Sequence, residues 1–449
     1  MKYAKGNHIY FLGIGGIGMS ALARFFKLHG ATVSGYDRAR TPLTQNLEEE
    51  GINIHYVDEI ELIPINPDLV IYTPAIPKNQ PELLFVQQKG YPLMKRAEVL
   101  GMLTQNIPTI AIAGTHGKTT ITSMVAHILH EAGIKITAFI GGIANNFGSN
   151  LVLSHESEFM VVEADEYDKS FLLLHPDIAV ISSMDADHLD IYQDHTKMLQ
   201  HYNQFASRIK KDGILIHKAG LPIDNDLNSI TYNSDKPAHF YAQNIRVEKG
   251  SFVYEWLVPN HKPITVSMKV PGRHNIENAL AASAVAMQIG LSPEIIAEAL
   301  GNYKGVWRRF DIKIETASHV YIDDYAHHPE ELKACINAVK ELYPNEKITG
   351  IFQPHLFTRT RNFLLEFAQS LNLLDELILL EIYPARELPI EGITSKTLLD
   401  ICESPKKNLI AKQDILEFIS KKRPKILLTV GAGDIDQIVE PLQKMISTW

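Results

Sequence analysis

Cysteine and long apolar runs are scarce in this chain of 449 residues, and each shortage excludes a class of protein. Only two cysteines occur, Cys335 and Cys402, in separate predicted elements, so we expect neither a disulfide framework nor a thiolate metal site. Two buried thiols in a reducing compartment are the expectation. The absence of any run of about 18 apolar residues argues against a membrane-spanning helix.

An excess of positive charge is also missing. The formal net charge is -9, whereas a nucleic-acid-binding surface needs a basic stripe. The chain enters a predicted strand directly at His8, so no signal peptide is expected. We therefore expect a cytoplasmic protein that binds neither nucleic acids nor membranes.

The remaining composition, with 45% hydrophobic and 21% charged residues, is typical of a globular protein, and the length favours more than one domain. Short apolar strands alternate with helical patterns along the chain. Glycines, acids and histidines follow the carboxyl ends of predicted strands, where α/β sheets bind ligands. The pattern predicts an α/β protein built from doubly wound, mainly parallel sheets.

The most informative motif is a glycine turn between a predicted strand at 109–113 and a predicted helix. Its sequence is Gly114-Thr-His-Gly-Lys-Thr-Thr120. Converging backbone N–H groups, the helix dipole and Lys118 favour a phosphate there, and Thr119 follows the lysine where a phosphate-bound Mg²⁺ takes a ligand. Only two residues separate the glycines, so the loop is shorter than the standard phosphate loop. The alternative is a glycine-rich turn that binds nothing.

A second glycine motif, Gly13-x-Gly15-x-x-Gly18, follows a predicted strand near the N-terminus. Asp37 ends the next predicted strand, at the spacing of a dinucleotide fingerprint. The motif predicts a diphosphate-linked nucleoside and does not specify nicotinamide. Thr73 follows a further predicted strand, and Arg96 opens a predicted helix, where it is either a phosphate ligand or a solvated cation.

Carboxylates and one imidazole follow predicted strands of the middle region. Glu163 stands where a second Mg²⁺ ligand is usual beside a phosphate loop, and His188 stands among three carboxylates. A solvated acidic loop is the alternative. Asn145 lies in a glycine and asparagine loop whose amides can line a sugar pocket. Asn275 and Asn278 share the first turn of a predicted helix, where they either cap the helix or read a purine edge.

In the last third of the chain, Arg308 and Arg309 lie beside aromatic residues at an apparent domain junction. There they either neutralise a phosphate or form surface ion pairs. Two later strands end in the segments Asp323-Asp-Tyr-Ala-His-His-Pro329 and Gln353-Pro-His-Leu-Phe-Thr-Arg-Thr-Arg361. Histidines and arginines at strand ends suit a small carboxylate ligand.

Together these motifs resemble the Mur ligase family of amide-bond-forming ATPases over essentially the whole chain. The family's motifs occur in the family's order: Gly-Thr-His-Gly-Lys-Thr-Thr, Glu163, Asp187-His188, His274-Asn-x-x-Asn278 and Arg308-Arg-Phe310. The N-terminal glycine motif, the two strand-end segments and Ile382-Tyr-Pro-Ala-Arg-Glu387 are most similar to family members that use L-alanine.

The resemblance implies three domains: a Rossmann-like UDP-sugar-binding domain at 1–106, a central P-loop-type ATPase domain at 107–308, and a Rossmann-like amino-acid-binding domain at 309–449. It implies an ATP-dependent ligase of peptidoglycan precursor synthesis that joins L-alanine to the lactyl carboxylate of UDP-N-acetylmuramate through an acyl phosphate. The implied cofactor is Mg²⁺, replaceable by Mn²⁺. The implied partners are the small-molecule substrates UDP-N-acetylmuramate, L-alanine and ATP, bound by a monomer or homodimer.

Site residues follow from the same resemblance. The implied catalytic residues are Lys118, Glu163, His188 and Arg309, and the implied metal ligands are Thr119, Glu163 and His188. The implied ATP-binding residues are Gly114, Thr115, His116, Gly117, Lys118, Thr119, Thr120, Asn275, Asn278, Arg309 and Asp324. The UDP sugar is assigned to Gly13, Gly15, Gly16, Gly18, Met19, Ser20, Asp37, Thr73, Arg96 and Asn145. The alanine pocket is assigned to Tyr325, His327, His355 and Arg359.

The chain departs from the family's usual pattern at two positions. Ala326 stands where many alanine-adding members have glycine, and Leu356 stands where they often have a basic residue. Leu356 leaves binding of the amino-acid carboxylate more dependent on Arg359.

Three other functions compete with this interpretation. A sibling that recycles murein tripeptide shares the first two domains' motifs, but the segment 353–361 is not expected in it. A NAD-dependent oxidoreductase built on the first domain leaves the phosphate loop and Glu163 unexplained. A non-catalytic nucleotide-binding regulator would release no phosphate.

Overall fold

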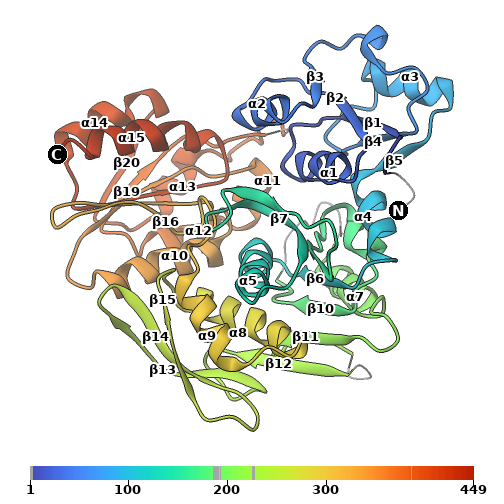
Figure 1. The fold of residues 1–449 in the computed structure, drawn as a ribbon. Coiled ribbons are helices and arrows are strands. Elements are labelled where there is room, and N and C mark those ends of the chain that lie inside the picture. Colours follow the sequence, from blue (N-terminus) through green and yellow to red (C-terminus); the bar gives the residue numbers. More distant parts are fainter. Residues whose placement is uncertain (1–3, 186–191, 193, 225–227, 386) are drawn as a thin grey trace. The chain divides into compact units, whose positions relative to one another are not determined.

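The computed structural model describes residues 4–185, 192, 194–224, 228–385 and 387–449 (Figure 1). Its strands form three sheets, of five, ten and six strands. Contacts divide the chain into two compact units, which are described separately. Unit 1 contains Met1–Tyr241, Leu257–Lys262 and Asn278–Ala299, and unit 2 contains Ala242–Trp256, Pro263–Glu277 and Leu300–Trp449.

The five-stranded sheet of unit 1 is parallel throughout, in the order β3-β2-β1-β4-β5. The strands are β1 (His8–Leu12), β2 (Thr32–Tyr36), β3 (Asn53–His55), β4 (Leu69–Tyr72) and β5 (Leu93–Lys95). The accompanying helices are α1 (Ile17–Leu28), α2 (Pro42–Glu49), η1 (Ile60–Leu62), α3 (Pro81–Lys89) and α4 (Arg96–Thr104). The central strand, β1, is almost entirely buried, as expected where helices cover both faces of a parallel sheet.

The second sheet of unit 1 is centred on β6 (Thr109–Ala113), in which every residue is buried. Within the unit its order is β12-β11-β10-β6-β9-β7-β8, and all pairs are parallel except the β7–β8 hairpin. The strands are β7 (Ile136–Ala144), β8 (Ser149–Val152), β9 (Phe159–Glu163), β10 (Ile178–Ile181), β11 (Ile214–Lys218) and β12 (Ser229–Asn233). The helices are α5 (Lys118–Glu131), η2 (Tyr167–Leu173), α7 (His195–Ala206), α8 (Arg273–Gln288) and α9 (Pro293–Asn302).

The sheet continues through β13 (Phe240–Glu248), which pairs with β12 at Phe240 and Tyr241, and ends in β14 (Ser251–Leu257) and β15 (Ile264–Met268). β14 and β15 are antiparallel.

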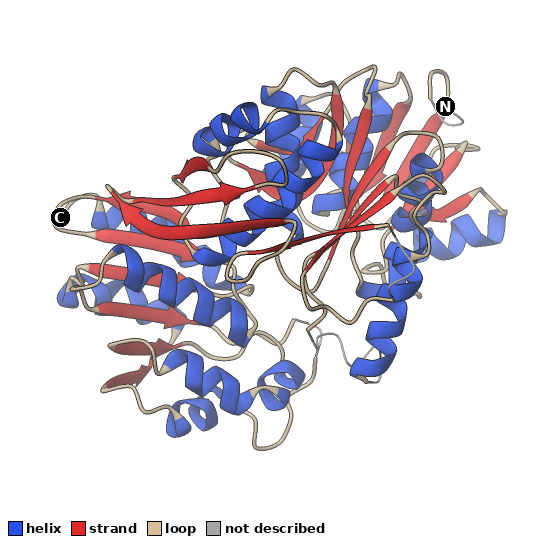
Figure 2. Ribbon diagram, turned by 90° about the horizontal axis from the view of Figure 1, so that it is seen from below, coloured by secondary structure: helices blue, strands red, loops and turns tan. Residues whose placement is uncertain are grey.

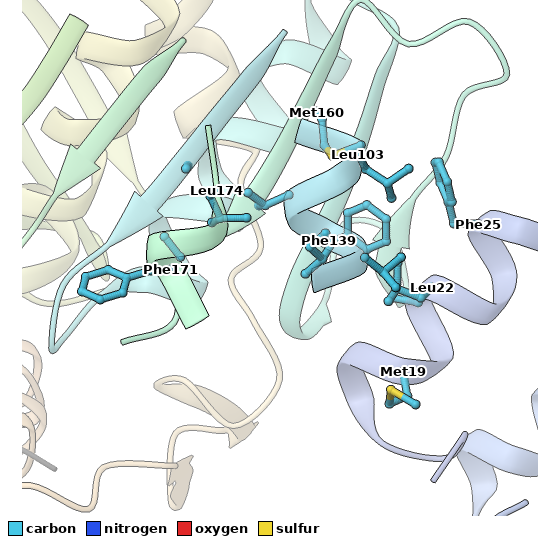
Figure 3. Close-up of a cluster of buried hydrophobic side chains, with 14 of the residues drawn as sticks. Met19, Leu22, Phe25, Leu103, Phe139, Met160, Phe171 and Leu174 are labelled. Atoms are coloured by element: carbon cyan, nitrogen blue, oxygen red, sulfur yellow. The ribbon is translucent and has the colours of Figure 1, made fainter. Parts of the chain in front are cut away.

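A single hydrophobic core joins the two sheets of unit 1 (Figure 3). Met19, Leu22 and Phe25 project from α1, and Leu103 projects from α4. The Phe25 and Phe139 ring centroids lie 5.6 Å apart, so a helix of the N-terminal sheet packs directly on β7 of the next one. The first two predicted domains therefore share buried apolar surface.

Unit 2 contains the six-stranded sheet, in the order β16-β17-β21-β18-β19-β20, in which only β16 and β17 are antiparallel. The strands are β16 (Asp311–Glu315), β17 (Val320–Asp324), β18 (Ile348–Phe352), β19 (Glu376–Leu379), β20 (Lys406–Leu409) and β21 (Ile426–Val430). The helices are α10 (Pro329–Leu342), α11 (Phe357–Asn362), α12 (Leu364–Leu371), α13 (Ser395–Ile401), η3 (Lys412–Asp414), α14 (Ile415–Lys422), η4 (Asp434–Ile438) and α15 (Val439–Ile446).

Figure 2, coloured by secondary structure, shows helices alongside the strands of the sheets, and the predicted α/β fold class with mainly parallel sheets is confirmed. The helix that follows the N-terminal glycine motif begins at Ile17, so the last glycine of the motif, Gly18, is already helical. Both cysteines are free and buried, as predicted. In the described part of the chain, no helix combines the length and the apolar character needed to cross a membrane.

Candidate active site

The predicted phosphate loop connects the buried β6 to the N-terminus of α5. Gly114 has φ +136° and Gly117 has φ +83°, and L side chains rarely adopt either conformation. A Cβ atom on Gly114 would lie 2.1 Å from the Ser182 Oγ, and one on Gly117 would lie 2.6 Å from the Asn278 Oδ1. Both glycines are therefore required by backbone conformation and by close packing.

Neighbouring loops fix the shape of this turn. The Ser182 hydroxyl, just after β10, donates to the carbonyls of Ala113 (3.2 Å) and His116 (2.5 Å). The Ser183 hydroxyl accepts from the backbone N–H of His116 at 2.8 Å. The Thr115 hydroxyl donates to the Asp185 carbonyl at 2.9 Å. The loop is held in place before any ligand contributes.

Lys118, the first residue of α5, points its ammonium group back into the turn. Its Nζ donates to the Gly114 carbonyl at 2.7 Å and to both carboxylate oxygens of Glu166, at 2.9 and 2.7 Å. Burial lowers the pKa of Lys118, but the nearby carboxylates of Glu166, Asp165 and Glu163 outweigh burial, and the net shift is upward. Lys118 is therefore held as a cation at the helix N-terminus.

The predicted metal ligands Thr119 and Glu163 lie together beside Lys118. Glu163 accepts a hydrogen bond from Thr119 and one from the Gly141 N–H at 2.5 Å. Burial raises the pKa of Glu163, although the contacts with Gly141, Lys118 and Thr119 oppose this shift. A divalent cation at this carboxylate would favour its charged form.

The third predicted metal ligand, His188, and its neighbour Asp187 lie outside the described residues. Among the residues that the structure does describe, no group of three or more His, Cys, Asp or Glu side chains is arranged to hold a metal ion. The two oxygen ligands that are described, Thr119 and Glu163, fit Mg²⁺, which commonly takes few protein ligands together with substrate phosphates and water.

The N-terminal glycine motif is assembled as predicted. The Gly13 and Ile14 N–H groups donate to the Tyr36 carbonyl at 2.8 and 3.0 Å, and the Gly15 N–H donates to the Asp37 carboxylate at 2.7 Å. A Cβ on Gly13 would lie 3.0 Å from Thr73, and one on Gly15 would lie 2.8 Å from Asp37. The loop, Asp37 and Thr73 therefore lie together at one edge of the sheet.

Arg96 connects this motif to the phosphate-loop side of unit 1. A Cβ on Gly18 would lie only 2.7 Å from the Arg96 Nη1, so Arg96 packs against the glycine turn. Arg96 also lines a small cavity together with Glu163 and Asp165. Arg96, predicted to bind the sugar nucleotide, and Glu163, predicted to bind Mg²⁺, therefore line the same small space.

The remaining residues predicted for the sugar nucleotide lie on α1 and in the β7–β8 turn. Gly16 precedes α1, and Met19 and Ser20 lie buried within it. Asn145 is exposed, in the turn. The turn's buried neighbour Asn150 donates to the Ile17 carbonyl at 2.5 Å and accepts from Arg24 at 3.2 Å, so β8 holds the first turn of α1.

Asn275 lies in the first turn of α8, whereas Asn278, the sixth residue of the helix, lies in the second turn and not in the first as predicted. Both residues are buried. Asn278 belongs to unit 1 and lies against Gly117 of the phosphate loop. Asn275 belongs to unit 2, and its amide donates to the Pro271 carbonyl at 2.6 Å.

In unit 2, the two arginines of the predicted junction have different environments. Arg308 is ion-paired with buried Asp323 at 3.0 Å and donates to the Gly431 carbonyl at 2.7 Å, so it is structural. The Arg309 guanidinium lies 5.0 Å from the Tyr325 ring centroid. Burial raises the pKa of Asp324 to about 6, while Arg309 and the N–H groups of Phe310 and Ala326 oppose the shift.

The four residues predicted for the amino acid lie together in unit 2, where β17 and β18 end. The His327 ring lies 5.4 Å from that of Tyr325 and 6.1 Å from that of His355, between centroids. The Arg359 Nη1 lies 3.4 Å from the His355 Nδ1. Burial lowers the pKa of His327 to about 4, against the attraction of Glu331, so this ring is neutral at pH 7. A neutral imidazole and a buried guanidinium suit a small ligand with one carboxylate.

Sequence reasoning missed three residues of these sites. Glu166 contacts Lys118, the Tyr383 ring stacks on that of His355 at 5.7 Å, and Glu387 accepts from the Thr358 N–H at 2.9 Å at the start of the turn that carries Arg359. Glu166 lies three residues after Glu163, and Glu387 ends the 382–387 segment. Both acids therefore lie in or beside motifs that the sequence shows, but their contacts form only in the tertiary structure.

Models of known protein families cover most of the chain. Three family models fit in succession: the Mur ligase family catalytic domain at residues 8–107, the Mur ligase middle domain at 112–286 and the Mur ligase glutamate ligase domain at 308–433.

Two bacterial relatives named UDP-N-acetylmuramate–L-alanine ligase cover nearly the same length. The one from Christiangramia forsetii is 47% identical over 98% of this chain and 97% of its own. The one from Flavobacterium psychrophilum is 48% identical over 98% of both.

Solved structures agree with the sequence comparison. The UDP-N-acetylmuramate–alanine ligase of Thermotoga maritima is 29% identical, with a TM-score of 0.85 over 98% of this chain and 99% of that one. A murein peptide ligase of Psychrobacter arcticus, 23% identical, has the same fold with a TM-score of 0.72 over 99% of both chains. Sequence, fold and site geometry agree, and this chain belongs to the Mur ligase family.

Proposed function

We propose that this enzyme joins L-alanine to the lactyl carboxylate of UDP-N-acetylmuramate at the expense of ATP, giving UDP-N-acetylmuramoyl-L-alanine, ADP and phosphate in peptidoglycan precursor synthesis. The observation that carries the proposal is the match, at 47% identity over 98% of the chain, to a relative named for this reaction. The nearness of Arg96 to Glu163, which line one small cavity, supports it, because a sugar-nucleotide carboxylate and a triphosphate must meet for the reaction to occur.

The first chemical step is phosphoryl transfer. A carboxylate is a poor electrophile, so ATP's γ-phosphate is transferred to the lactyl carboxylate to make an acyl phosphate, with Lys118 neutralising charge on the transferred group. The amine of L-alanine then attacks the acyl carbon, and phosphate leaves. The intermediate has to be kept from water, because hydrolysis would return the starting acid.

Thr119 and Glu163 would hold Mg²⁺, with Mn²⁺ as a substitute, and His188 is assigned as a further ligand by family resemblance. The metal supplies charge neutralisation for the phosphates. Thr119 and Glu163 offer hard oxygen ligands beside Lys118, which supports this assignment.

We assign the amino acid to Tyr325, His327, His355 and Arg359, with the Arg359 guanidinium binding the alanine carboxylate. Leu356 supplies no positive charge, so Arg359 is the cation that we expect to dominate binding. Asn275, Asn278, Arg309 and Asp324 are assigned to ATP, and the glycine loop, Asp37 and Thr73 to the UDP diphosphate and ribose. We expect a cytoplasmic monomer or homodimer.

The test is phosphate release from ATP with purified enzyme, measured with each substrate omitted in turn. We expect release only when UDP-N-acetylmuramate and L-alanine are both present. Release with murein tripeptide in place of L-alanine would favour the recycling sibling. Enhanced NADH fluorescence on titration, without phosphate release, would favour an oxidoreductase. If neither phosphate release nor enhanced NADH fluorescence occurs, the result would favour a non-catalytic nucleotide-binding regulator.

A further inference from the structure

The ammonium group of Lys118 is engaged by two acceptor groups in this structure, the Gly114 carbonyl and the Glu166 carboxylate. An ammonium carries three N–H donors. Three acceptors lie at hydrogen-bonding distance: the Gly114 carbonyl at 2.7 Å and the two carboxylate oxygens of Glu166 at 2.9 and 2.7 Å. The two oxygens belong to one carboxylate and share a donor, so a phosphate that enters here meets a lysine whose charge is already paired with Glu166.

The carboxylate of Glu166 is built into the protein at this position. Glu166 is 1% exposed, and its backbone carbonyl accepts a hydrogen bond from the Tyr192 hydroxyl. It directly precedes η2, whose Phe171 belongs to the core of unit 1. Moving Lys118 is cheaper than moving Glu166, because the lysine stem has four rotatable bonds.

We propose that Glu166 is a positioning residue that competes with the nucleotide phosphate for Lys118. This inference rests on the proposed binding of ATP at the 114–120 loop. When the triphosphate enters, Lys118 exchanges its ion pair with Glu166 for one with a phosphate group. The Gly114 carbonyl, which belongs to the loop itself, remains a partner throughout.

The exchange selects for strongly charged ligands. A hydrogen bond between two charged groups is stronger than one between neutral groups, so a weakly charged ligand gains too little from Lys118 to replace Glu166. A triphosphate brings several negative charges to the same helix N-terminus. Glu166 therefore reduces nucleotide affinity in general and reduces it most for ligands of low charge.

The test is the affinity of the full-length Glu166→Gln variant for Mg²⁺ and a non-hydrolysable ATP analogue, measured by calorimetry. Glutamine preserves the shape but leaves a neutral acceptor. We expect the Kd of the analogue to fall at least about fivefold, equivalent to about 1 kcal/mol. The KM for ATP falls with it, and the KM for UDP-N-acetylmuramate stays unchanged.

Asp165→Asn is the matched control. This substitution removes one negative charge near Lys118, as Glu166→Gln does. The Asp165 carboxylate, however, accepts a hydrogen bond from the Tyr167 N–H and acts on Lys118 through its charge alone. We expect a smaller change in Kd than for Glu166→Gln. In the Lys118→Ala background, Glu166→Gln should no longer tighten binding, because the competing donor is gone.

An unchanged or weaker affinity for the ATP analogue, in a Glu166→Gln variant with the same melting temperature as the wild type, would overturn the inference. Equal tightening by Asp165→Asn, or tightening that persists without Lys118, would also overturn it. Glu166→Asp, which withdraws the carboxylate by one methylene, replaces the glutamine variant if that variant is unfolded. A wild-type enzyme that fails to bind the analogue contradicts the proposed function instead.

Discussion

Glu82 is a buried acid, and removing its charge should make the protein more stable at neutral and alkaline pH. The side chain lies on α3, fully buried, and accepts a hydrogen bond from the Tyr10 hydroxyl at 2.5 Å. The same hydroxyl lies 2.7 Å from the His55 Nε2. Burial raises the pKa of Glu82 to about 7, and the Asp58 carboxylate adds to the rise, against the hydrogen bond from Tyr10.

The sign and size of the effect follow from linkage. Because the pKa in the folded state is above the value of 4.5 for the unfolded chain, folding favours the protonated acid. That contribution to stability is complete below pH 4.5 and is lost as the pH rises through about 7. At pH 8, ionisation of Glu82 has therefore lowered the free energy of unfolding by about 3 kcal/mol relative to its value at low pH.

Glu82→Gln keeps the shape and an acceptor for Tyr10 and removes the ionisation. We expect its free energy of unfolding, relative to wild type, to increase by up to about 3 kcal/mol between pH 5 and pH 8. Urea unfolding of both proteins at a series of pH values measures the difference, in which the titration of all other groups cancels. Glu61→Gln, exposed in η1, is the control and should show no such trend. Parallel curves for Glu82→Gln and wild type would refute the reasoning.

Four further predictions concern the proposed reaction. Lys118→Ala should abolish phosphate release while the sugar nucleotide still binds in calorimetry, and loss of both would contradict separate sites. Arg359→Ala should raise the KM for L-alanine about tenfold or more, equivalent to about 1.4 kcal/mol, and an unchanged KM would exclude Arg359 from the pocket. Glu163→Gln should shift the Mg²⁺ titration of activity to higher concentration, whereas a wild-type titration curve would exclude it as a ligand. Glu387→Gln should raise the KM for L-alanine more than that for ATP, because Glu387 accepts from Thr358 beside Arg359, and equal changes in both constants would indicate general disruption.

The elements that carry the motifs were predictable because their signals are local. The strand at 109–113 has the bounds that its apolar run indicates. The helix after the segment 323–329 begins at Pro329, and proline is a favoured first helical residue. The grouping of Asp37 and Thr73 around Gly13 was also predictable, since parallel strands end at one edge of a sheet.

What the sequence did not indicate depends on contacts between distant segments. Nothing in the spacing of Lys118 and Glu166 predicts their hydrogen bonds, because the turn after β9 brings the carboxylate back to the helix. The division of the first turns of α8 between two compact units was also unpredicted, because the i, i+3 pattern of Asn275 and Asn278 describes the helix and not its neighbours.

The shared core of unit 1 limits how members of this family can be recombined. A chimera joined at residue 106 would combine Leu22 and Phe25 of one protein with a foreign partner in place of Phe139, so the apolar surfaces of the two parts would no longer match. It would also lose the hydrogen bonds that Asn150 forms with Ile17 and Arg24. Exchange of the sugar-nucleotide module therefore has to include the hairpin formed by β7 and β8.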